Sequence, residues 1–247
     1  MAASASWVSP LGRPASPRET DHLRAADGRI DAIRNIIWDV DGTLFDTYPA
    51  IARAFRAALH ESGRDAGLGR IMTLARDSLA HCAASLAEEY GLDQAGFEAV
   101  VARHYERTRP EDQPPFPGVK EVCEQICRAD GQNVIVTHRG PRGTAELLAA
   151  GGLSELFSGW ITRADPYPRK PDPAAFNAII NRHGLRRDAT VAVGDRDIDI
   201  LAGKAAGVVT CFFGEAPAGV DADITITDFG ELARLLFPTD RQRSSFR

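Results

Sequence analysis

The chain has no long apolar run and no concentrated block of basic residues. No stretch approaches the roughly eighteen consecutive apolar residues that a membrane-spanning helix needs. The formal net charge is −5, whereas nucleic-acid-binding surfaces normally cluster Lys and Arg. We therefore expect neither a membrane nor a nucleic acid as partner. At 247 residues, 44% hydrophobic and 26% charged, the chain suffices for one large domain or a domain with an insertion.

Cysteine patterns typical of zinc sites or disulfide frameworks are also missing. Cys123 and Cys127 share an apolar stripe with Val119, Val122 and Ile126, spaced as on the buried face of a helix. This spacing favours reduced core thiols in a cytoplasmic protein over a metal or redox site. The four cysteines are Cys82, Cys123, Cys127 and Cys211.

The two ends of the chain lack apolar periodicity. Residues 1–28 are rich in Ala, Ser, Pro and Arg and contain no continuous apolar segment of a secretory signal. We predict a disordered extension there and a polar tail at 238–247. Arg13 and Arg18, without an acid among the first eighteen residues, give a faint similarity to a transit peptide, which is the less favoured interpretation.

Between the ends, short apolar runs alternate with helical patterns. Helices are expected at about 118–129 and 173–183, the second capped by Asp172 with Pro173 in its first position. The alternation predicts an α/β fold, a Rossmann-like parallel sheet in three layers with helices on both faces. Strands are expected within 35–42 and at 133–137, 190–194, 208–213 and 224–227, with a weaker one at 160–161.

Residues 48–108 interrupt this alternation with helical signals alone. Phe97 and Val101 belong to one apolar stripe, with Asp93 placed to cap its helix, and Phe55 and Leu59 belong to another. We predict an α-helical cap domain at 47–116, inserted into a core formed by 29–46 and 117–237.

Acidic residues follow two of the predicted strands. Asp39 and Asp41 end the first, where strand alternation sends both side chains to one side, and Gly42 and Thr43 turn the chain away. Taken alone, such a motif also fits a turn or a helix cap. The stretch 195–199 carries three more acids after another strand. A helix starting near Asp195 would place its side chain one turn from that of Asp199.

The two acidic clusters together indicate a cation. Carboxylates gathered at one sheet edge would repel by about 1 to 4 kcal/mol per pair at contact distance. An all-oxygen ligand set favours Mg²⁺ over zinc, and magnesium with open positions commonly binds a substrate phosphate. Thr137 ends a third strand at the same edge, and Lys170 lies in a proline-stiffened loop before a predicted helix.

In this order, the residues resemble the four motifs of the haloacid dehalogenase-like superfamily, phosphatase branch, with a phosphoglycolate phosphatase-like cap. The resemblance spans about 33–227 and rests on the motif 39–43, Thr137, the pair Lys170–Pro171, and the motif 194–199.

The resemblance implies a residue set for phosphoryl transfer. Asp39 would form an aspartyl-phosphate, while Asp41 protonates the leaving oxygen and then activates water. Mg²⁺ would be held by Asp39, the main-chain carbonyl of Asp41 and Asp195, supported by Asp199. Thr137 and Lys170 would act on the phosphoryl oxygens. Gly42, Thr43 and His138 are further candidates for substrate binding, and His138 would touch the leaving group or orient a loop.

The resulting hypothesis is a magnesium-dependent phosphatase for a small phosphorylated metabolite. A phosphomutase of the same superfamily would return the phosphoryl group to its substrate, and a non-catalytic binding protein would keep the fold alone. The second acid, Asp41, favours phosphoryl transfer over dehalogenation, since a halide needs no proton. Cap side chains that could meet a substrate anion are Arg53, Arg56, Arg76, His104 and Arg107.

Overall fold

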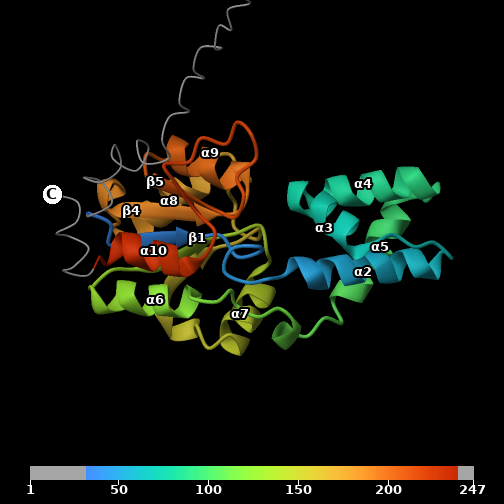
Figure 1. Ribbon diagram of the computed structural model, residues 1–247, viewed down its shortest axis with the longest axis horizontal. Coiled ribbons are helices and arrows are strands. Elements are labelled where there is room, and N and C mark those ends of the chain that lie inside the picture. The colour runs from blue at the N-terminus through green and yellow to red at the C-terminus, as the bar shows by residue number, and fades with distance from the viewer. Residues whose placement is uncertain (1–31, 239–247) are drawn as a thin grey trace, which may run out of the picture.

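The computed structural model describes residues 32–238. The predicted extension at 1–28, and all but the first residue of the predicted tail at 238–247, lie outside these residues. Within the described part of the chain, six strands form one parallel sheet in the order β3-β2-β1-β4-β5-β6 (Figure 1). The strands are β1 (Asn35–Trp38), β2 (Asn133–Val136), β3 (Phe157–Ile161), β4 (Thr190–Gly194), β5 (Val209–Phe213) and β6 (Ile224–Ile226).

Each central strand is buried on both faces. In β1, Ile36 and Trp38 belong to the hydrophobic cluster on one face of the sheet, and Ile37 belongs to the cluster on the other. This division follows from the alternation of side chains along a strand. It also explains why β1, β2 and β4 are uninterrupted apolar runs in the sequence, as is typical of parallel sheets.

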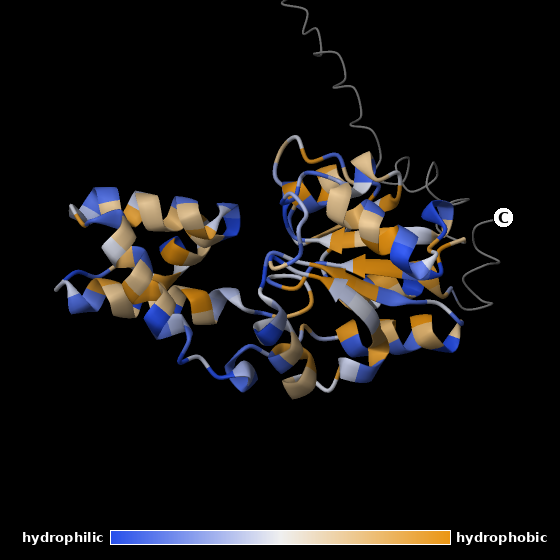
Figure 2. Cartoon of the chain, turned by 180° about the vertical axis from the view of Figure 1, so that it is seen from behind, coloured by the Kyte–Doolittle hydropathy of each residue, from blue (hydrophilic) through white to orange (hydrophobic). Residues whose placement is uncertain are grey.

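Helices cover the two faces of the sheet (Figures 1 and 2). The cluster on one face includes residues of α6 (Val119–Arg128), α7 (Pro141–Ala150) and α10 (Phe229–Leu236). The opposite cluster includes residues of α8 (Ala174–His183) and α9 (Asp197–Ala205). The predicted three-layer α/β architecture is thereby confirmed. Short 3₁₀ turns lie at η1 (Pro110–Asp112), η2 (Ser154–Leu156) and η3 (Arg187–Ala189).

Four further helices pack around a hydrophobic cluster of their own, beside the sheet (Figure 1). Asp93 caps the last of them by accepting a hydrogen bond from the amide of Gly96 at 2.7 Å, as the sequence predicts. We call residues 48–105 the helical unit. Its helices are α2 (Tyr48–Glu61), α3 (Leu68–Asp77), α4 (Leu79–Tyr90) and α5 (Gln94–Tyr105).

The chain enters and leaves the helical unit through two segments that lie side by side. The amide of Asp46 donates to the carbonyl of Pro114 at 2.9 Å, and the amide of Phe116 donates to the carbonyl of Leu44 at 2.9 Å. The two connections are therefore held together at the point where they meet the sheet.

Some sequence expectations need correction. Strand β3 is longer than the predicted 160–161, because its half-exposed side chains and Gly159 leave no apolar run. Helix α8 starts after Pro173, although Asp172 still accepts a hydrogen bond from the amide of Ala174 at 2.8 Å. Cys127 is exposed, because it lies in the last turn of α6 at the margin of the apolar stripe. Within 32–238, no helix is long and apolar enough to cross a membrane.

Candidate active site

The predicted site residues lie at the carboxyl ends of β1, β2 and β4, where ligands bind in open α/β sheets. Asp39 directly follows β1, and its amide still donates to the carbonyl of Val193 in β4 at 3.0 Å. Thr137 follows β2, and its amide donates to Ile161 of β3 at 3.0 Å. The sheet hydrogen bonds thus run one residue past the strands and fix the positions of both side chains.

Three carboxylates and one lysine form a buried cluster at this edge. Oxygen atoms of Asp39, Asp195 and Asp199 all lie within 4.8 Å of one another. The Nζ of Lys170 donates to Asp39 Oδ1 at 2.6 Å and to Asp199 Oδ1 at 2.5 Å. Its third proton goes to the carbonyl of Val136 at 3.1 Å, so the ammonium group has a full set of acceptors.

The electrostatics of the cluster favour an additional positive charge. Burial raises the pKa of Asp39 to about 7, despite the opposing charge of Lys170. Burial, together with the charges of Asp39 and Asp199, raises the pKa of Asp195 to about 8. Burial alone would lower the pKa of Lys170, but its two carboxylate partners outweigh that effect and raise it. One lysine does not compensate three acids of which two are buried and one is partly buried, and the all-oxygen donor set suits a hard cation such as Mg²⁺.

Asp195 lies in a turn and does not begin a helix. Helix α9 starts at Asp197 with Arg196 as N-cap, because the carboxylate of Asp199 accepts a hydrogen bond from the amide of Arg196 at 3.2 Å. The helix therefore starts two residues after Asp195, which lies outside it. Asp195 and Asp199 nevertheless converge, through the turn and not through a shared helix face.

Asp195 is bound directly by Thr43, the last residue of the first motif, and by Tyr48, the first residue of α2. The hydroxyl of Thr43 donates to Asp195 Oδ1 at 3.3 Å, and the hydroxyl of Tyr48 donates to Asp195 Oδ2 at 2.9 Å. Gly42 has a φ of +80°, and a Cβ there would lie 2.4 Å from Asp195 Oδ2. Only glycine suits this position, since it combines a left-handed backbone with a close approach to Asp195.

The loop that carries Lys170 is held by His138. The Nε2 of His138 accepts a hydrogen bond from the amide of Lys170 at 3.0 Å. Burial and the nearby charge of Lys170 lower the pKa of His138 to about 4, which keeps the ring neutral and able to accept. Of the two roles expected from the sequence, this contact supports the orientation of a loop.

The carboxylate of Asp41 is bound by an arginine and is not part of the buried acid cluster. Arg139 Nη2 lies 2.5 Å from Asp41 Oδ1, and Arg139 Nε lies 3.1 Å from the same oxygen. The guanidinium also donates to the hydroxyl of Tyr105 at 2.5 Å. Sequence patterns alone do not mark Arg139, Tyr48 or Tyr105 as site residues, because no spacing in the sequence relates them to the acids.

Two of the five candidate cationic side chains form ion pairs within the helical unit. Arg56 binds Asp65 in an exposed pair at 2.7 Å, and His104 binds Glu61 at 2.8 Å. Arg76 lies over the ring of Tyr48, 5.2 Å from its centroid. Arg76 is thereby the member of this set that reaches a residue in contact with the acid cluster.

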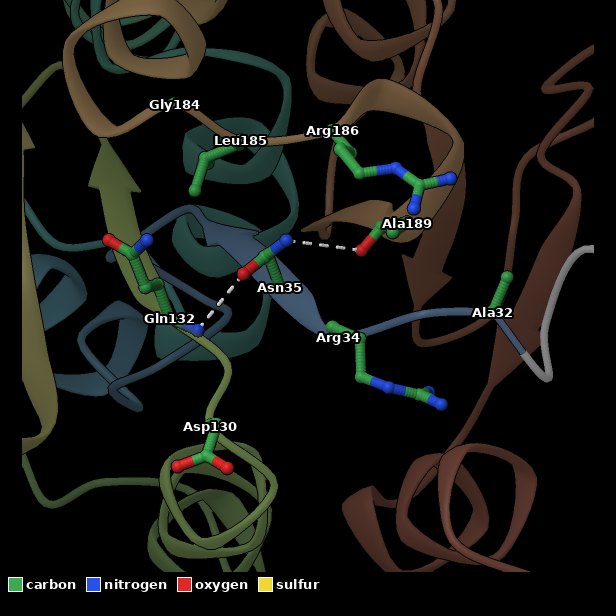
Figure 3. A pocket seen from close by; sticks show the side chains of 9 residues that line it. All are labelled: Ala32, Arg34, Asn35, Asp130, Gln132, Gly184, Leu185, Arg186 and Ala189. Atoms are coloured by element: carbon green, nitrogen blue, oxygen red, sulfur yellow. Dashed lines mark hydrogen bonds between the residues drawn. The ribbon is translucent and has the colours of Figure 1, made fainter.

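A hollow of about 410 Å³ lies at the opposite end of the strands from the acid cluster (Figure 3). Asn35 at the start of β1 spans it, since its amide donates to Ala189 at 3.4 Å and its oxygen accepts from the amide of Gln132 at 3.0 Å. Both polar groups of Asn35 are satisfied by main chain. The polar side chain of Asn35 at this hollow therefore has a structural role, joining the segments of Gln132 and Ala189 to the start of β1.

Comparisons with known proteins agree with this geometry. The family model of the haloacid dehalogenase-like hydrolases matches residues 33–207. The chain is 31% identical to a phosphoglycolate phosphatase of Yersinia pestis over 223 residues, covering 83% of this chain and 93% of the relative. The chain therefore belongs to the haloacid dehalogenase-like hydrolases, as its motifs predict.

Solved structures share the fold at lower identity. A predicted phosphoglycolate phosphatase from Haemophilus somnus superposes with a TM-score of 0.74 at 23% identity, covering 83% of this chain and 98% of the other. A family hydrolase from Deinococcus radiodurans, solved with bound phosphate and sodium, gives a TM-score of 0.72 at 19% identity, covering 85% and 100%. These likenesses support the architecture of sheet and helical unit.

Proposed function

We propose that the protein is a magnesium-dependent phosphatase that hydrolyses a small phosphate monoester through an aspartyl-phosphate on Asp39. The observation that carries the proposal is the buried cluster of Asp39, Asp195 and Asp199 around Lys170, at the binding edge of the sheet. The phosphoglycolate phosphatases among its relatives support phosphoglycolate as the first substrate to test.

The proposed reaction has two steps. In the first, a carboxylate oxygen of Asp39 attacks phosphorus, the bond to the ester oxygen breaks, and Asp41 gives that oxygen its proton. In the second, Asp41 takes a proton from water as the water oxygen attacks phosphorus. Phosphate then leaves and the Asp39 carboxylate is restored.

The remaining residues hold the charges in place. Asp39, Asp195 and the main-chain carbonyl of Asp41 would hold Mg²⁺, with Asp199 supporting the site. The bound ion would offset negative charge on the phosphoryl group. Lys170 and the hydroxyl of Thr137 would bind phosphoryl oxygens. Gly42, Thr43 and His138 would shape the site, through Asp195 and through the loop of Lys170. The helical unit would act as a cap over the substrate.

The test is phosphate release from phosphoglycolate and a panel of small phosphate esters, with and without Mg²⁺. Asp39→Asn should lower turnover by about a thousandfold or more, because it removes the nucleophile, while circular dichroism stays unchanged. Excess chelator should silence the native protein, and magnesium should restore it. Normal turnover in the variant would refute the mechanism. Phosphorylation of Asp39 without net hydrolysis of any ester would point to a mutase.

A further inference from the structure

The Asp41 carboxylate is bound by Arg139, which is not a member of the acid cluster. Its Oδ1 accepts from Arg139 Nη2 at 2.5 Å and from Nε at 3.1 Å, and its Oδ2 lies 3.3 Å from the same Nε. The Arg139 side chain is largely shielded, with 12% of its surface exposed, whereas that of Asp41 is 31% exposed. The ion pair of Arg139 and Asp41 therefore has a defined geometry and partial burial, unlike an exposed surface ion pair.

One nitrogen of Arg139 that binds Asp41, Nη2, also bonds to the helical unit. Nη2 donates to the hydroxyl of Tyr105 in α5 at 2.5 Å, and that hydroxyl donates to Gln113 Oε1 at 2.6 Å. Gln113 is buried in the segment that returns from the helical unit to the sheet. The Arg139 network, comprising Asp41, Arg139, Tyr105 and Gln113, thus joins four separate segments of the chain.

Within this network, the direction of the Asp41 carboxylate depends on the position of α5. The planar guanidinium offers donors in a fixed fork, so a change at Tyr105 also alters the donors that face Asp41. If α5 moves away, the partly buried Arg139 loses an acceptor and is free to turn. The carboxylate that it holds then loses its alignment as well.

We propose that Arg139 is a positioning residue that, through Tyr105, couples the helical unit to Asp41. Asp41 is then aligned for proton transfer only while the Tyr105 hydroxyl is bound to Arg139. The inference rests on the acid–base role of Asp41 proposed above. It adds that Tyr105, whose hydroxyl bonds to Arg139 and Gln113, controls the rate of the same step.

Tyr105→Phe is the sharpest test, because it removes the hydroxyl and keeps the ring, whose centroid lies 5.7 Å from Arg139 Cζ. The kcat for phosphoglycolate should fall about tenfold, the value of a hydrogen bond to a charged group, with KM unchanged. Tyr90→Phe is the matched control, since Tyr90 also donates from the helical unit, to the carbonyl of Asp65 at 2.8 Å, outside the network. Its kcat should equal that of the native protein.

A double-mutant cycle decides whether the effect passes through Asp41. On an Asp41→Asn background, Tyr105→Phe should change kcat by less than about twofold, because the group being positioned has already lost its acid–base function. Gln113→Leu should behave in the same way as Tyr105→Phe on both backgrounds. Equal losses with and without Asp41 would overturn the coupling, as would a rise in KM at constant kcat.

The leaving group offers an independent measurement. Nitrophenolate departs without a proton, so the burst of nitrophenolate from p-nitrophenyl phosphate should be nearly unaffected by Tyr105→Phe, while the corresponding step for phosphoglycolate slows. Equal slowing of both esters would overturn the proposal. If Asp41→Asn alone turned over phosphoglycolate as fast as the native protein, the proposed function of Asp41 would fail. If Asp41→Asn is slow but the effects of Asp41→Asn and Tyr105→Phe are additive, the coupling is overturned and the proposed function of Asp41 stands.

Discussion

At the scale of single residues, burial determines the chemistry of the acid cluster. Asp39 and Asp199 are almost inaccessible, yet both bind the ammonium of Lys170. The burial that raises the pKa of Asp39 and Asp195 also strengthens every charge interaction within the site. A cation is therefore attracted more strongly to this site than to a cluster of exposed carboxylates.

Tyr48 should tune the metal site through Asp195. Its hydroxyl fixes Oδ2 of a proposed metal ligand, and partners of this kind are worth about ten- to a hundredfold in metal affinity. We expect Tyr48→Phe to weaken Mg²⁺ binding about tenfold, measured by titration calorimetry on the folded protein.

Tyr90→Phe serves again as the control, because the Tyr90 hydroxyl donates to the carbonyl of Asp65 and not to a residue of the acid cluster. Unchanged Mg²⁺ affinity in Tyr48→Phe would show that Thr43 and the turn alone position Asp195. Loss of the same affinity in Tyr90→Phe would instead point to a general loosening of the helical unit.

At the scale of elements, the helical unit has a core of its own. Leu86 in α4 is fully buried within the cluster formed by α2–α5, while Leu79 of the same helix is 50% exposed. Leu86→Ala should therefore cost about 2 to 5 kcal/mol in the free energy of unfolding, because it leaves a cavity among packed helices.

Leu79→Ala is the matched substitution, and it should cost no more than about 0.5 kcal/mol. Urea unfolding followed by circular dichroism compares the two variants with the native protein. Similar losses in both would mean that the α2–α5 cluster contributes little to stability.

At the scale of the whole molecule, the acid cluster links folding to pH and magnesium. Asp39 and Asp195 have raised pKa values in the fold, so between pH 4 and about 8 the native state binds more protons than the unfolded chain. Their contribution to stability is fully present below about pH 4 and is lost progressively as the pH rises to about 8. His138, with a pKa lowered to about 4, has the opposite effect below its ordinary value of 6.5.

The window above pH 6.5 therefore isolates the two carboxylates from His138. Without metal, we expect the melting temperature to fall between pH 6.5 and 8.5. Added Mg²⁺ should raise it more at pH 8.5, where it competes with fewer protons. Asp195→Asn should reduce both effects, measured by thermal unfolding at matched ionic strength. An increase in magnesium stabilisation on lowering the pH would contradict the assignment.

The sequence by itself determined the family and the frame of the fold. Uninterrupted apolar runs such as 190–194 become buried strands, because a parallel sheet covered on both faces excludes polar side chains from its centre. The same runs end at Asp39, Thr137 and the acids after β4, so the order of the motifs predicts which residues gather at one edge.

Only the tertiary structure decided which partners hold these groups. Arg139 lies 98 positions from Asp41, and Tyr48 lies 147 positions from Asp195, so no local periodicity connects either pair. Patterns in a sequence report burial and turns along one element, whereas hydrogen bonds between elements depend on how the sheet and the helical unit come together.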